Sequence, residues 1–145
     1  MVCQFQGFER FIEILDAEPE KDNPGAVDIG RVNGDIEFKN VSFSYSDSKE
    51  VLNNIDLHIG KGKTFALVGP SGGGKTTICH LIPHFYNITG GEILIDGKNI
   101  DAVTLDSLRR NIGIVQQDIY LFNASVRENI LYGRLDATEE EIVAG

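Results

Sequence analysis

Several stretches of alternating apolar and polar positions predict β-strands. In residues 36–45 the alternation slips by one position near Asn40, which predicts a strand with a β-bulge. Residues 55–59 alternate again and predict the next strand. The stretch "GGEILIDGKNI" predicts a hairpin with Asp96-Gly97 as its turn.

Two apolar runs do not alternate, and both predict strands that are buried on both faces. They are residues 64–68 and residues 112–115. The segment after the first run has apolar residues at helical spacing, which predicts a helix with Ile78, Leu81, Ile82 and Phe85 on one face. Strand, loop and helix in this order indicate a βα unit.

Shorter helices are predicted by their N-terminal residues. Thr104 should cap the helix in "TLDSLRR". Capping boxes pair Ser125 with Glu128 and Thr138 with Glu141. The helix that begins at Thr138 has about seven residues before the end of the chain, too few to be stable alone. We therefore expect the sequence to be cut within an element.

The N-terminal region combines a helical pattern with a linker. Phe5, Phe8, Ile12 and Leu15 are spaced as on one helix face that ends before Pro19. The stretch "AEPEKDNPGAVDIG" is rich in proline, glycine and charge, as linkers are. The helix either packs on its own domain or continues from an upstream element.

The glycine loop between the first apolar run and its helix carries the main chemical signal. "GPSGGGKTT", from Gly69 to Thr77, contains the phosphate-binding pattern G-x-x-x-x-G-K-[ST]. Glycines allow backbone amides to turn toward one point, and a helix N-terminus adds free N–H donors. Lys75 should reach the β- and γ-phosphates, and the Thr76 hydroxyl should bind Mg²⁺. The simpler alternative, a tight turn, does not explain this spacing with a strand and a helix around it.

Composition excludes several classes of function. The 145 residues carry a net charge of -9, which argues against a nucleic-acid partner. No apolar run is long enough to span a membrane, and no signal peptide is visible, so we expect the isolated chain to be soluble and cytoplasmic. Cys3 and Cys79 form no metal or redox motif and are expected to be free thiols.

The neighbours of the loop give it a family context. "VSFSY", "GGEILIDG", "IGIVQQDIYLF" and "ENILYG" together resemble the nucleotide-binding domain of an ATP-binding cassette (ABC) exporter whose membrane and ATP-binding domains share one polypeptide. The resemblance implies an α/β fold with an incomplete P-loop NTPase (RecA-like) core and an antiparallel β subdomain. It also implies that residues 1–33 are the junction from the last transmembrane helix, and that residues 34–145 are the N-terminal part of the domain.

The resemblance assigns a nucleotide site to particular positions. Tyr45 falls on the A-loop position that stacks on adenine, and Val51 lines the nucleoside side unless it is an ordinary strand residue. Gln117 falls on the Q-loop position, where its amide oxygen is a ligand for Mg²⁺ or water. Lys75 and Gln117 are the expected catalytic residues, with Mg²⁺ on Thr76 and Gln117. The cofactors are ATP and Mg²⁺, bound by Tyr45, Val51, Gly69, Pro70, Ser71, Gly72, Gly73, Gly74, Lys75, Thr76, Thr77 and Gln117.

The same resemblance implies protein partners. An apolar patch of Tyr120, Leu121, Phe122 and Tyr132 should receive a coupling helix of the transmembrane domain, although Tyr120 and Tyr132 could instead be core aromatics. A second nucleotide-binding domain should join in a head-to-tail dimer. The parent protein is then expected at the cytoplasmic face of the membrane.

Several family motifs do not follow Gln117. They are the Walker B aspartate, the catalytic glutamate, the LSGGQ signature and the switch histidine. "ILID" at residues 93–96 only imitates a Walker B strand, since Gly97 follows it, and the three histidines at positions 58, 80 and 84 have structural or solvated roles. We therefore expect Mg·ATP binding without turnover in this chain, because the attacking water lacks its orienting group.

Other P-loop functions remain as alternatives. A small phosphotransferase would need a lid with several arginines, and Arg109-Arg110 is the only adjacent pair. A GTPase would need an N-K-x-D motif, which does not occur. A non-catalytic nucleotide-binding module remains possible.

Overall fold

The computed structural model describes residues 12, 15–45, 50–116 and 121–144. Contacts between residues divide the chain into two units, residues 1–113 and residues 114–145.

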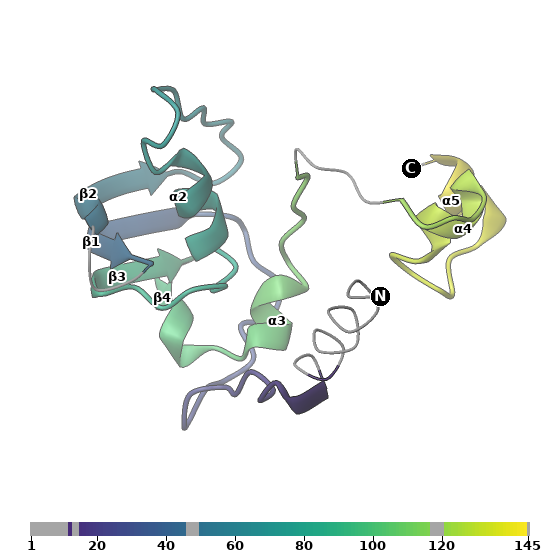
Figure 1. The fold of residues 1–145 in the computed structure, drawn as a ribbon, viewed down its shortest axis with the longest axis horizontal. Coiled ribbons are helices and arrows are strands. Elements are labelled where there is room, and N and C mark those ends of the chain that lie inside the picture. The colour runs from purple at the N-terminus through teal and green to yellow at the C-terminus, as the bar shows by residue number, and fades with distance from the viewer. Residues whose placement is uncertain (1–11, 13–14, 46–49, 117–120, 145) are drawn as a thin grey trace, which may run out of the picture. The chain divides into compact units, whose positions relative to one another are not determined.

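A four-stranded antiparallel sheet forms the centre of the first unit (Figure 1). Its strand order is β2-β1-β3-β4. The strands are β1 (Ile36–Ser44), β2 (Glu50–Ile59), β3 (Gly90–Ile95) and β4 (Lys98–Asn99). The alternating segments of the sequence therefore form this sheet, as predicted.

A β-bulge in β1 lies at the predicted place. The pairing with β2 and with β3 shifts register after Phe38 and Lys39, respectively, and Asn40 has a φ of 50°. The opposing Gly91 has a φ of 83°, and a Cβ there would collide with the carbonyl oxygens of Lys39 and Asn40. Only glycine allows the backbone of β3 to approach the bulge this closely.

The predicted hairpin turn is also present. Asp96 and Gly97, between β3 and β4, have φ angles of 50° and 77°, as a type I′ turn requires. The Asp96 carboxylate accepts hydrogen bonds from the backbone amides of Asn33, at 2.5 Å, and Asp35, at 3.0 Å. These bonds, led by that from Asn33, lower the pKa of Asp96.

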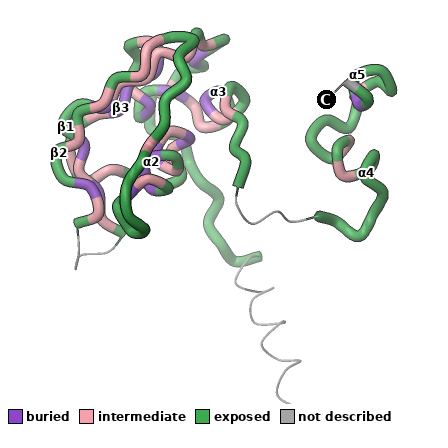
Figure 2. Tube along the Cα trace, turned by 90° about the horizontal axis from the view of Figure 1, so that it is seen from above, coloured by how far each residue is buried: buried purple, intermediate pink, exposed green. Residues whose placement is uncertain are grey.

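The core of this unit lies between the sheet and the elements that follow it. Helix α2 (Lys75–Leu81) contributes Ile78 and Leu81, and helix α3 (Leu105–Arg109) contributes Leu108. They pack with buried strand residues such as Phe38 and Ile93. Figure 2 shows the buried positions of the strands, α2 and α3. A 3₁₀ helix, η1 (Ile100–Ala102), links β4 to α3.

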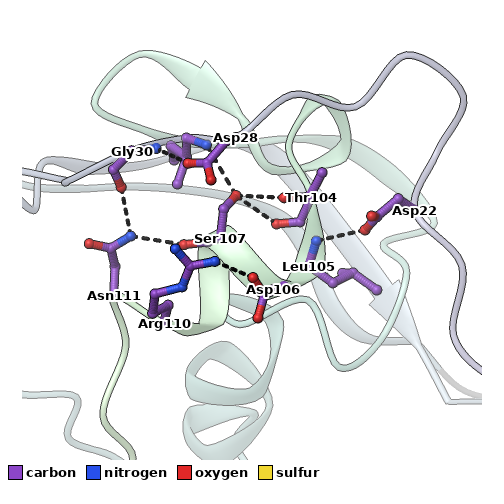
Figure 3. Close-up of polar contacts among 10 residues, drawn as sticks. Asp22, Asp28, Gly30, Thr104, Leu105, Asp106, Ser107, Arg110 and Asn111 are labelled. Carbon is purple, nitrogen blue, oxygen red and sulfur yellow. Dashed lines mark hydrogen bonds and ion pairs between the residues drawn. The ribbon is translucent and has the colours of Figure 1, made fainter.

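The predicted linker contacts α3 along much of its length, and we call residues 20–32 the strap. Asp22 accepts a hydrogen bond from the amide of Leu105 at 2.7 Å, in the first turn of α3 (Figure 3). Thr104 is the N-cap residue by position, yet its side chain caps nothing and donates to Ser107 Oγ instead. The predicted capping by Thr104 is therefore wrong, because a distant aspartate takes that role.

Ser107 connects the strap to α3 from the inside. Its hydroxyl is almost fully buried and accepts from the amide of Ile29 at 3.1 Å. The Asn111 amide donates to the carbonyls of Gly30 and Ser107, each at 2.8 Å (Figure 3). Val27 pairs with Val103 in a parallel bridge.

The two apolar runs are not strands in this structure, so that prediction is wrong. Neither residues 64–68 nor residues 112–115 pair with any strand among the described residues. Val68 is 90% exposed and Val115 is 96% exposed. A strand buried on both faces needs hydrogen-bonded neighbours and helices on each side, and the described residues supply neither to these runs.

Helix α2 forms as predicted, but it is shorter than the helix that the apolar spacing predicts. It ends at Leu81, and Phe85 lies beyond it, 42% exposed. Of the four residues predicted on the N-terminal helix, Ile12 and Leu15 are helical and have exposed side chains. Phe5 and Phe8 are outside the described residues. The proposed boundary between residues 33 and 34 stays a prediction.

The second unit contains two short helices, α4 (Val126–Leu131) and α5 (Glu139–Ala144). The capping box of Ser125 and Glu128 begins α4 as predicted. Thr138 and Glu141 make the corresponding bonds at α5, where Glu141 accepts from the amide of Thr138 at 2.9 Å. Within the described part of the chain, no helix has the length and apolar character needed to cross a membrane.

Candidate nucleotide-binding site

The glycine loop has the backbone that its sequence predicts. Gly69, Gly72 and Gly74 have φ angles of 153°, 79° and 79°, which favour glycine. The amide of Gly73 donates to the carbonyl of Pro70 at 3.2 Å. Among the described residues, the amides of Gly72 and Gly74 donate no hydrogen bond, and Gly74, the N-cap residue of α2, has no side-chain cap. The loop therefore has free N–H donors at the beginning of a helix.

The antiparallel sheet fixes the C-terminal end of this loop. Gly74 is buried against the start of β2, where a Cβ on Gly74 would lie 2.6 Å from Leu52 Cδ2 and 3.4 Å from the carbonyl oxygen of Val51. Both the φ angle at position 74 and the closeness of the Leu52 side chain therefore require glycine there. Val51, predicted to line the nucleoside side, is half-buried at the edge of the core.

Lys75 lies over the loop. Its ammonium group donates to the carbonyl oxygens of Gly69 at 3.0 Å and Pro70 at 2.6 Å. These bonds hold the ammonium group beside the loop, where it would lie close to an anion bound by the loop amides. Thr76 follows at the surface, with its side chain exposed.

Tyr45 lies beside the first turn of α2. Its hydroxyl and the Thr77 hydroxyl are 3.0 Å apart and share a hydrogen bond, and Thr77 itself is 5% exposed. Tyr45 is 53% exposed, and its ring packs edge-to-face with Phe43 and Tyr86, at centroid distances of 4.8 and 5.1 Å. An exposed aromatic ring is thereby attached to the helix that begins at the glycine loop.

These residues fit a magnesium-bound nucleoside triphosphate. Free amides, an ammonium group and a threonine hydroxyl are donors and ligands for phosphate and its Mg²⁺, and an exposed ring can stack on a base. In the described part of the chain, no group of three histidine, cysteine, aspartate or glutamate side chains could hold a metal ion. A Mg²⁺ here would be held by phosphate oxygens together with oxygen ligands such as the Thr76 hydroxyl.

Some predicted site residues remain untested. Gln117 and Tyr120 lie outside the described residues. Of the two cysteines, Cys79 is free and exposed, and Cys3 is also outside the described residues.

Two residues at the site were not predicted. Leu52 meets Gly74, and Tyr86 meets Tyr45. The aromatic pair Phe85-Tyr86 after the helix was a visible signal for a further aromatic contact, whereas nothing in the sequence indicates that Leu52 faces the loop.

The second unit carries the predicted apolar patch in part. Leu121 and Tyr132 are 70% and 67% exposed, and the rings of Phe122 and Tyr132 lie 4.6 Å apart between centroids. A pocket of about 350 Å³ adjoins them, lined by Leu121, Phe122, Ala124, Val126, Asn129 and Ile130. Exposed apolar side chains that gather around a pocket are typical of an interaction site.

Comparison with known proteins decides the family. The model of the ABC transporter family matches residues 52–144, most of the chain. The chain belongs to the ABC transporter family. This result confirms the resemblance predicted from the sequence, and with it the P-loop NTPase fold class.

The relatives are several times longer than this ABC chain. An uncharacterized ABC transporter ATP-binding protein, YwjA, of Bacillus subtilis is 50% identical over 137 residues, covering 94% of this chain and 24% of the relative. An ATP-dependent lipid A-core flippase of Syntrophus aciditrophicus is 50% identical over 138 residues, with 94% and 23% covered. The ATP-bound structure of a bacterial Atm1-family ABC exporter matches with a TM-score of 0.84 and 39% identity, covering 94% of this chain and 24% of that one. The chain thus spans about a quarter of the length of these relatives.

Proposed function

We propose that this chain is an ATP-binding portion of an ABC exporter and that it binds Mg·ATP. The observation that carries the proposal is the glycine loop with free amides and Lys75 at the start of α2, next to the exposed ring of Tyr45. The ATP bound to the similar Atm1-family exporter supports the choice of nucleotide.

Each residue has a distinct role in this proposal. The free amides of Gly72 and Gly74 donate to the β-phosphate, and the Lys75 ammonium neutralises charge between the β- and γ-phosphates. Thr76 offers its hydroxyl to Mg²⁺, with Gln117 as a second ligand, and Tyr45 stacks on adenine beside Val51. When bound, Mg·ATP supplies the phosphoanhydride bond whose hydrolysis drives transport in the whole protein.

The proposed partners follow from the family and from the surface of the second unit. We assign the patch of Leu121, Phe122 and Tyr132, with Tyr120, to a coupling helix of a transmembrane domain. A second nucleotide-binding domain completes the site in a head-to-tail dimer. The parent protein is accordingly placed at the cytoplasmic face of the membrane.

Calorimetric titration with Mg·ATP tests the proposal. Lys75→Ala should weaken binding about tenfold or more, because hydrogen bonds to charged groups contribute about 1.5–3 kcal/mol. Lys63→Ala is a matched control, since it removes the same charge from an exposed position outside the loop. Failure of the folded wild-type chain to bind Mg·ATP, or equal binding by Lys75→Ala and wild type, would overturn the proposal.

A further inference from the structure

Tyr45 is held by contacts with three parts of the fold. Phe43, in β1 two residues before Tyr45, is 2% exposed and packs edge-to-face against the Tyr45 ring. Thr77, in α2, shares a hydrogen bond with the Tyr45 hydroxyl, and Tyr86, in the segment after α2, contacts the rings of both Tyr45 and Phe43, at centroid distances of 5.1 and 5.7 Å. The ring planes of Tyr45 and Tyr86 are nearly perpendicular, at 88°, which is a favourable edge-to-face arrangement.

The backbone that carries Tyr86 is firmly anchored. Arg109 donates hydrogen bonds to the carbonyl oxygens of Pro83 and His84, both at 3.0 Å. The same guanidinium lies 5.1 Å from the centre of the Phe85 ring and forms an ion pair with Glu20 of the strap. Arg109 therefore contacts each of the three residues that precede Tyr86 in the chain.

Tyr86 is also continuous in sequence with the phosphate-binding loop. Only α2 and four further residues separate it from Lys75 at the start of the helix. Tyr45, by contrast, lies at the end of β1, next to residues 46–49, which are outside the described part of the chain. A contact between the two tyrosines thus fixes the ring on the sheet relative to the loop that would hold the phosphates.

We propose that Tyr86 is a positioning residue for nucleobase binding, which holds the ring of Tyr45 in the orientation that stacks on the base. This inference rests on the proposed function, since it needs a nucleotide in the site. Tyr86 acts through Tyr45 and leaves the phosphate contacts unchanged.

The proposal predicts a specific pattern of affinities. Loss of the Tyr86 ring should weaken Mg·ATP about two- to tenfold, the range expected for one aromatic pair. It should leave Mg·tripolyphosphate, which has no base, unchanged. A residue that only supports the fold would weaken both ligands together.

The experiment compares four variants of the chain by calorimetry, with both ligands. Tyr86→Ala should lose affinity for Mg·ATP alone, and Tyr86→Phe, which keeps the ring, should bind like wild type. In the Tyr45→Ala background, Tyr86→Ala should have no further effect, because the ring that it positions is gone. Tyr86→Leu replaces Tyr86→Ala if thermal melting shows that the latter does not fold.

Three results would overturn the inference while leaving the proposed function intact. They are wild-type affinity for Mg·ATP in Tyr86→Ala, an equal loss for both ligands, and additive losses in the double variant. Failure of wild type to bind Mg·ATP would instead refute the proposed function itself.

Discussion

Gly72 and Gly74 allow a direct test of how the glycine loop is held. Both have a φ of 79°, so alanine at either position carries the same left-handed strain, roughly 1–2 kcal/mol. Their surroundings differ. A Cβ on Gly72 would meet nothing within 4 Å, whereas a Cβ on Gly74 would lie 2.6 Å from Leu52 Cδ2.

The two alanine variants should therefore differ in stability. Gly72→Ala should cost only the strain, and Gly74→Ala should cost roughly 1–3 kcal/mol more, because a well-packed contact is overfilled. At about 4 °C per kcal/mol, Gly74→Ala should melt several degrees below Gly72→Ala. Thermal unfolding followed by circular dichroism, with both variants in the same buffer, measures the difference.

Leu52→Val provides the matched rescue. It removes the δ carbons that a Cβ on Gly74 would strike. In a double-mutant cycle, Leu52→Val and Gly74→Ala should be coupled favourably, by about 0.5–3 kcal/mol. Equal melting of the two single alanine variants, or strict additivity with Leu52→Val, would show that the sheet does not fix the loop through this contact.

Three further predictions concern the strap, the hairpin and the second unit. Ser107→Ala should leave the buried amide of Ile29 without its acceptor, at a cost in stability of about 1–3 kcal/mol. Hydrogen exchange at that amide should then be at least severalfold faster than in an Asp106→Asn control. Unchanged exchange would contradict the strap contact. Asp96 has a lowered pKa, so its charge stabilises the fold above the ordinary value of 3.8 and this contribution is lost as pH falls through the folded value. Asp96→Asn keeps the turn, and its melting temperature should lie below that of wild type near neutral pH, with the gap closing in acid; a constant gap would exclude this titration. Ser125→Ala should cost α4 about 1 kcal/mol, seen as faster exchange of the Glu128 amide, and normal protection there would show that the capping box is dispensable.

The sheet and its turns could be predicted because their signals are local. The slip of alternation near Asn40 reports a bulge directly, and Asp96-Gly97 specifies a type I′ turn with its own φ angles. The glycine loop is equally local, since its spacing and glycines determine which backbone conformations are open to it. Such features need no knowledge of distant residues.

Other features depend on partners that a local pattern cannot identify. Residues 64–68 read as a buried strand, but a strand forms only where neighbours complete its hydrogen bonds, and the described residues provide none. Asp22 caps α3 from 83 positions away, so the expected role of Thr104 could not be corrected from sequence. For the same reason, the contacts of Leu52 and Tyr86 could not be predicted, because their partners are distant in the sequence.

The candidate site thus depends on the antiparallel sheet more than on the segment that precedes the loop. Residues 64–68 pair with no strand among the described residues, whereas Tyr45, directly after β1, contacts Thr77, and Leu52, in β2, contacts Gly74. Under the proposed function, the contact at Tyr45 would serve the base and the contact at Gly74 would serve the phosphates. A change that shifts β1 against β2 should therefore alter recognition of the base and of the phosphates together, whereas a change at Tyr86 should separate them.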